Sequence, residues 1–135
     1  MMNERVIVMS LFEGFQSFNF EEGVPYVSVT KNGVTFNKAV IMKLGYPENV
    51  VLLINAGEKK IALQSCTTAT PNNVPFYKEN ARKILSVRWN AKDLLNTLQD
   101  ITGWDLSKVS YRIDGILIKE ENAMLFDLSN AKCLN

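Results

Sequence analysis

Histidine is absent from the 135 residues of this chain. Its absence excludes Ser-His and Cys-His nucleophilic catalysis, acid–base chemistry by imidazole, and histidine ligation of metals. No pair of carboxylates stands beside a recognisable nucleophile or metal partner, and the isolated glycines Gly33, Gly45 and Gly57 do not build a phosphate loop. We therefore expect no enzymatic activity, no metal site and no cofactor.

Cysteine is scarce, with only Cys66 and Cys133 present in two distant parts of the chain. Their separation excludes a C-x-x-C metal or redox motif. Two interpretations are open, a single long-range disulfide or two buried thiols in a reducing cytosol, and the second is favoured.

Long apolar runs are also lacking, because no segment approaches the roughly 20 apolar residues of a membrane-spanning helix. The first residues, "MMNERVIVMSLF", place the acidic Glu4 before a short apolar run, which is not typical of a secretory signal. We expect a cytoplasmic protein with no membrane partner.

The composition that is present is that of an ordinary folded domain. Apolar residues make up 47% of the chain and charged residues 21%, which favours a globular protein over a disordered one. The length fits a single domain over residues 1–135. A net charge of +1 argues against a protein that coats polyanions, but it leaves room for a local basic face.

Two helices are predicted from capping signals. The first covers 38–44, with Asn37 as N-cap and Gly45 at its end, and the second covers 91–101, with Asn90 as N-cap and Gly103 at its end. Asn32-Gly33 predicts a turn, after which 34–36 is either a returning strand or the run into the first helix. One or two helical turns are expected within 76–84. Strands are predicted at 5–12, 26–31, 49–55, 60–66, 85–89, 108–114, 115–120 and 123–128.

The order of these parts repeats along the chain. A strand, an aromatic-Asn pair, a helix and a Gly-aromatic pair occur in each half, with Phe36-Asn37 matched by Trp89-Asn90. We predict an α+β fold, mostly β, in which two β-α-β-β halves pack around one core. The halves span 24–66 and 84–133, and 67–75 is their linker. The alternative is convergence, because local capping alone favours Asn before a helix and Gly after it.

Residues 32–64, "NGVTFNKAVIMKLGYPENVVLLINAGEKKIALQ", resemble the AbrB/SpoVT-like swapped-hairpin domain of bacterial transition-state regulators and antitoxins. A Gly-led strand, a short helix ending in Leu-Gly, and a hairpin with a charged turn carry the resemblance. It covers about a quarter of the chain. The matching apolar or glycine positions are Val34, Phe36, Leu44, Gly45, Val50, Leu52, Ile54, Ile61 and Leu63.

The resemblance implies an interleaved barrel, built from two copies of the unit, that binds DNA. A chain with two copies would be its own pseudo-dimer, or it would form a homodimer through the first copy. The sequence departs from the family pattern in two places, and the loss of a basic pair weakens the implied DNA binding more than the implied fold. Asn37 stands where the family usually has proline, and Ile41 and Met42 occupy positions at which the family tends to carry basic residues.

Basic residues cluster in both halves and supply the candidate nucleic-acid-binding residues. If the halves are related, Lys31 and Lys38 lie near the places taken by Arg88 and Lys92, which makes one face basic. The alternative is that these cations only keep a mixed surface soluble. The candidates are Lys31, Lys38, Lys43, Arg88 and Lys92.

Four phenylalanines, Phe12, Phe15, Phe18 and Phe20, crowd together near the N-terminus. They are candidates for partner binding, although covering one open end of the core is the favoured interpretation. The expected function is that of a small DNA-binding transcriptional regulator of bacterial or phage type. The alternative is a non-catalytic protein-interaction or oligomeric accessory module that uses the phenylalanines or exposed strand edges. No small-molecule substrate is evident.

Overall fold

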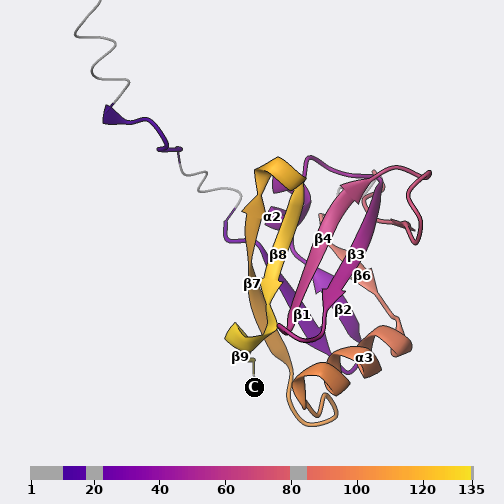
Figure 1. Cartoon of the computed structure of the whole chain (residues 1–135). Coiled ribbons are helices and arrows are strands. Elements are labelled where there is room, and N and C mark those ends of the chain that lie inside the picture. The colour runs from indigo at the N-terminus through magenta and orange to yellow at the C-terminus, as the bar shows by residue number, and fades with distance from the viewer. Residues whose placement is uncertain (1–10, 18–22, 80–84, 135) are drawn as a thin grey trace, which may run out of the picture.

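A computed structural model describes residues 11–17, 23–79 and 85–134 of the chain. Within these ranges, nine strands form one antiparallel sheet that curls into a half-barrel (Figure 1). The prediction of a mostly β, α+β fold is confirmed. The strands are β1 (Tyr26–Thr30), β2 (Gly33–Phe36), β3 (Asn49–Asn55), β4 (Lys60–Cys66), β5 (Val74–Pro75), β6 (Val87–Trp89), β7 (Tyr111–Ile118), β8 (Ala123–Asp127) and β9 (Lys132–Cys133).

The order of strands along the sheet is β5-β3-β4-β8-β7-β1-β2-β6, and β9 pairs with β7 outside this path. Two helices, α2 (Lys38–Lys43) and α3 (Lys92–Thr102), lie at opposite ends of the sheet (Figure 1). Two short 3-10 helices, η1 (Lys119–Glu121) and η2 (Leu128–Asn130), flank β8. The predicted hairpin of 49–55 with 60–66 is confirmed, and 34–36 is the returning strand.

The core fills the concave side of the sheet, because alternate residues of each strand point inward. Val27 and Val29 of β1, and Ile61 and Leu63 of β4, are almost fully buried in this way. Phe36 lies at the centre, with ring centroids 5.6 Å from Phe76 and 6.0 Å from Phe126. The stripe predicted on the second helix also faces the core, with Leu95 and Leu98 buried and Leu94 and Ile101 partly buried.

The two helix starts differ, although both follow an aromatic-Asn pair. Asn37 is the N-cap of α2, and its Oδ1 accepts hydrogen bonds from the backbone N–H groups of Val40 and Tyr26. Its Nδ2 donates to the Val24 carbonyl at 2.8 Å, which ties α2 to the start of β1. The predicted cap by Asn90 is wrong. Ala91 is the N-cap of α3 and provides no side-chain bond.

One long strand replaces two predicted short ones. The sequence predicted a break between 108–114 and 115–120, but β7 runs through Gly115 without a turn. The N-terminal part of β7 pairs with β1, and the part from Gly115 onward pairs with β8. A Cβ at Gly115 would lie 2.8 Å from both Met124 Cγ and Phe126 Cε1, so glycine is needed where β7 packs closely against the core.

Some predicted elements fall outside the described residues. The strand predicted at 5–12 does so except for its last two positions, and residues 80–84 of the segment 76–84 are also outside. Residues 76–79 of that segment are not helical. The span 67–75, predicted as a linker, ends in the short strand β5.

Most strand pairings are preserved when β1 to β4 are exchanged for β5 to β8. Replacing β1, β2, β3 and β4 by β5, β6, β7 and β8 turns the pair β1–β7 into β5–β3 and the pair β3–β4 into β7–β8. The pairs β4–β8 and β2–β6 map onto themselves, centred on Ala62↔Leu125 and Thr35↔Arg88. Two pairs have no counterpart: β1 pairs with β2, but β5 does not pair with β6, and β9 pairs with β7 without an equivalent strand beside β3.

The inward side chains follow the same exchange. The registers place Val74 of β5 where β1 has Val27, and Trp89 of β6 where β2 has Phe36. An apolar residue therefore points inward at each of these equivalent positions.

Asn37 and Asn90 allow a matched test of capping. Asn37→Ala removes the cap of α2 and the bonds to Val24 and Tyr26, so we expect a loss of about 1–2 kcal/mol in the free energy of unfolding. Asn90→Ala should cost less than about 0.5 kcal/mol, because its side chain caps nothing. Urea unfolding of both variants measures the difference, and equal losses would contradict this assignment of caps.

Candidate functional site

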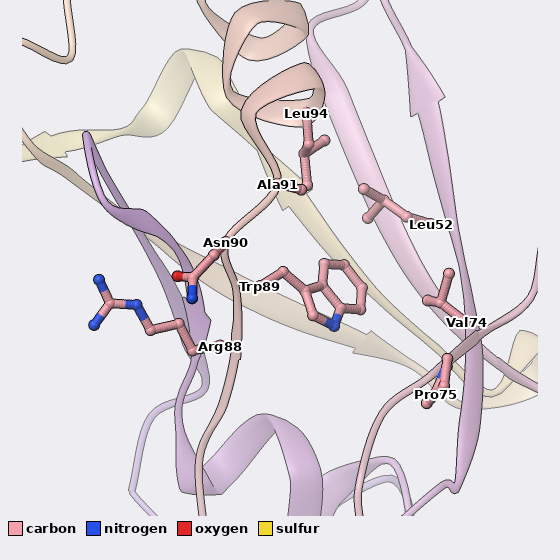
Figure 2. Close-up of a pocket in the computed structure, with 8 residues that line it drawn as sticks. All are labelled: Leu52, Val74, Pro75, Arg88, Trp89, Asn90, Ala91 and Leu94. Atoms are coloured by element: carbon pink, nitrogen blue, oxygen red, sulfur yellow. The ribbon is translucent and has the colours of Figure 1, made fainter.

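An apolar groove of about 570 Å³ opens between the two ends of the curled sheet. Leu52 of β3 and the two residues of β5 form one wall. Strand β6 and the start of α3 form the other, with Trp89 and Leu94 directed toward the first wall (Figure 2). Grooves of this size and lining are typical of ligand-binding sites in proteins. The lining residues are Leu52, Val74, Pro75, Arg88, Trp89, Asn90, Ala91 and Leu94.

Strand alternation explains which side chains enter the groove. Trp89 points inward and packs on Phe36 and Phe76, with ring centroids 5.1 and 6.1 Å apart. Arg88, its neighbour, points to the outer side of β6 (Figure 2). The groove is therefore an opening onto the aromatic part of the core, with a charged side chain outside its rim.

Pro75 lacks a donor that a ladder between β5 and β6 would use. Tyr26 and Asn37 are opposite each other at one end of the β1–β2 pair and are joined by hydrogen bonds. Because hydrogen-bonded and non-hydrogen-bonded pairs alternate along an antiparallel ladder, Ser28 and Thr35 are also a hydrogen-bonded pair. The equivalent positions in the second half are Pro75 and Arg88. Proline has no backbone N–H, so β5 cannot donate where β1 does.

The same alternation shows which backbone groups of β6 face the groove. Val34 and Phe36 direct their N–H and C=O groups toward β6, where they pair with Trp89 and Val87. The N–H and C=O of Arg88 then point away from β2, into the gap between β6 and β5, which we call the seam. Among the strands in the described part of the chain, none pairs with β6 on this side.

Three of the five predicted basic residues lie together beside the seam. The Arg88 guanidinium donates to the Asn32 carbonyl at 3.2 Å, next to Lys31 in the β1–β2 turn. Lys31 and Lys92 both line a smaller cleft of about 250 Å³ under α3. Lys38 and Lys43 are at the other end of the sheet, in α2 (Figure 1). The structure thus brings together Lys31, Arg88 and Lys92, and separates the other two.

The phenylalanines predicted to cover the core do not all do so. Phe12 and Phe15 contact each other edge to face, with centroids 5.6 Å apart, but are 60% and 72% exposed. Covering the core is therefore the wrong interpretation for these two, while Phe18 and Phe20 lie outside the described residues.

Both cysteines are free, so no disulfide joins them. The prediction of buried thiols is wrong, because Cys66 is only partly buried and Cys133 is exposed.

One carboxylate has a shifted pKa with a local cause. The Ser107 hydroxyl and then the Ser107 backbone N–H donate to Asp105, and together they lower the pKa of that exposed carboxyl. The pair forms an Asx-type turn after α3 rather than an acid–base site. In the part of the chain that the structure describes, no three acidic or cysteine side chains are grouped so as to hold a metal ion.

Sequence reasoning missed the apolar half of this site. Leu52 looks like an ordinary strand residue, and Val74-Pro75 is in a span typical of a linker. Pro75 was the available signal, because a proline beside a β-branched residue is typical of an edge strand.

Comparison of the chain with family models, with curated proteins and with solved structures gives no match. Of the helices that the structure describes, none has the length and apolar character needed to cross a membrane.

Amide hydrogen exchange tests the arrangement of β6. We expect the Arg88 amide to exchange much faster than that of Thr35, its equivalent in β2, which donates within the β1–β2 ladder. The amides of Val87 and Trp89 should be protected because they face β2. A protected Arg88 amide in the free protein would show that the seam edge is already occupied.

Proposed function

We propose that this chain is a non-catalytic protein-interaction module that binds an extended segment of a partner in the seam between β5 and β6. One observation carries the proposal: β6 directs the N–H and C=O of Arg88 into an apolar groove, at the place where the other half has a paired strand. Exposed edges of this kind bind extended chains by adding a strand.

Main-chain hydrogen bonds and apolar side-chain contacts would have different roles in binding the segment. Main-chain hydrogen bonds to β6 would hold any extended segment, whatever its sequence. Apolar side chains of that segment would enter the groove beside Leu52, Val74 and Trp89 and lose their contact with water. Pro75 is consistent with these roles, because it removes a backbone donor that β5 would need to pair with β6.

We also propose that the chain contains two copies of one unit that form a pseudo-dimer, as the AbrB-like resemblance implies. The first copy would run from β1 to β4 and the second from β5 to β8, so the second would begin within the span 67–75 and not at residue 84. The support is the exchange of pairings described above, together with the equivalent inward residues Phe36 and Trp89. In this interpretation the seam is the position at which the second copy lost one ladder, and a binding site took its place.

Strand addition can be tested with a pool of extended peptides that carry apolar residues at alternate positions. Binding should protect the Arg88 amide from exchange and shift the Trp89 indole resonance, since both lie at the seam. Val74→Asp should weaken binding by about tenfold or more, because it places an unpaired charge on an apolar wall. Two-dimensional NMR of the labelled full chain measures both effects.

Val24→Asp is the matched control, since Val24 is also exposed but lies away from the groove lining. It should bind the peptides as the unchanged protein does. The proposal fails if no peptide in the pool alters the Arg88 and Trp89 signals.

A second candidate is the DNA-binding regulator expected from the sequence. The gathering of Lys31, Arg88 and Lys92 at one end of the sheet favours it, because neighbouring cations can neutralise neighbouring phosphates. Lys38 and Lys43 lie at the other end of the sheet, in α2, and are not part of this group.

Duplex binding would then depend on one end of the molecule. Lys31→Glu with Lys92→Glu should abolish binding to labelled duplex DNA, and the unchanged protein should bind more weakly as salt rises. Lys38→Glu with Lys43→Glu makes the same change of charge at the other end and should have little effect. Equal losses from both pairs, or no binding at low salt, would exclude this candidate.

A further inference from the structure

We propose that the segment bound in the seam alternates apolar and acidic residues, with an acidic side chain opposite Arg88. This inference depends on the proposed function and adds the chemical class of the partner.

The position of Arg88 sets the geometry. Because its N–H and C=O point into the seam, a strand added to β6 would place one residue in a hydrogen-bonded pair with Arg88. Residues directly opposite each other in a ladder direct their side chains to the same face. The partner residue opposite Arg88 would therefore point outward, as Arg88 does, and its two neighbours would point into the groove.

The groove dictates what the inward residues must be. Its walls are the aliphatic side chains of Leu52, Val74 and Leu94 and the indole of Trp89 (Figure 2). A charged or strongly polar side chain would lose its hydration there without gaining a partner. The neighbours of the residue opposite Arg88 must accordingly be apolar.

The outer face dictates the intervening residues. Across the sheet, Arg88 is opposite Thr35, which is opposite Ser28, so its two nearest cross-strand positions offer no carboxylate. Among the described residues, no acidic group is within ion-pair distance of Arg88. Arg88 donates instead to the neutral carbonyl of Asn32. A cation with this surrounding favours an opposing carboxylate over a neutral or basic residue.

Two further cations extend this preference along the seam. Lys31 follows β1 next to the carbonyl that Arg88 contacts, and Lys92 begins α3 just after the groove. On this side of the seam the acid is Asp93, in the first turn of α3, whereas Glu48 and Glu79 lie on the far side, in the pocket that adjoins Pro75. The β6 side of the seam therefore carries three cations against one acid, which is complementary to a segment with acidic residues at its outward positions.

Three synthetic peptides test the inference. They share the same apolar residues at alternate positions and carry Glu, Gln or Lys at the others. The full-length Trp104→Phe variant leaves Trp89 as the single fluorescent tryptophan, and Trp104 lies away from the groove, stacked on Tyr111. At low salt the Glu peptide should bind about tenfold more tightly than the Gln peptide, and the difference should shrink as salt rises.

Reversing the charge at position 88 is a more specific test of the acidic preference than the peptide comparison alone. Arg88→Glu should invert the order, so that the Lys peptide binds more tightly than the Glu peptide, while Lys38→Glu at the other end should leave the order unchanged. Equal binding of the Glu and Gln peptides would overturn the acidic preference and leave strand addition standing. If none of the three peptides changes the Trp89 emission or protects the Arg88 amide, both proposals fail.

Discussion

An antiparallel ladder needs a hydrogen-bond donor on each strand, and the second half of this chain lacks one at Pro75. The open groove of the molecule lies at that position. The sheet curls far enough to bring β5 and β6 to opposite walls of one groove, yet it does not close. The equivalent of the Ser28–Thr35 pair is absent there, and Trp89 is only partly buried whereas Phe36 is fully buried.

The open seam exposes part of the core, the indole of Trp89, which still packs against other core residues. Phe36 is fully buried because the first half closes over it, whereas Trp89 contacts Phe36 and Phe76 on one side and the groove on the other. A ligand in the groove would thus contact a residue that is already held by the core. The proposed binding would therefore need little ordering of the protein, and this would lower the entropic cost of association.

Local patterns predicted most elements of the fold. Gly45 and Gly103 both take a left-handed conformation after their helices, as their positions in the sequence indicated. The failures arose where distant contacts override local preference. Gly115 resembled a turn but is an interior strand residue packed against Met124, and Asn90 resembled an N-cap but caps nothing. The candidate site was only half predictable, because Arg88 is visible as a charge while the opposition of β5 and β6 depends on closure of the sheet.

The strand pairing changes the interpretation of the five predicted basic residues. Taken from the sequence, five cations suggested one basic face, but α2 and α3 lie at opposite ends of the sheet, which separates Lys38 from Lys92. In the proposed pseudo-dimer, equivalent residues would lie far apart unless they were near its two-fold axis. Arg88 does lie at the centre of the β2–β6 pairing, opposite Thr35. Of the cations named from the sequence, Arg88 is therefore the one that lines the groove and whose backbone faces it.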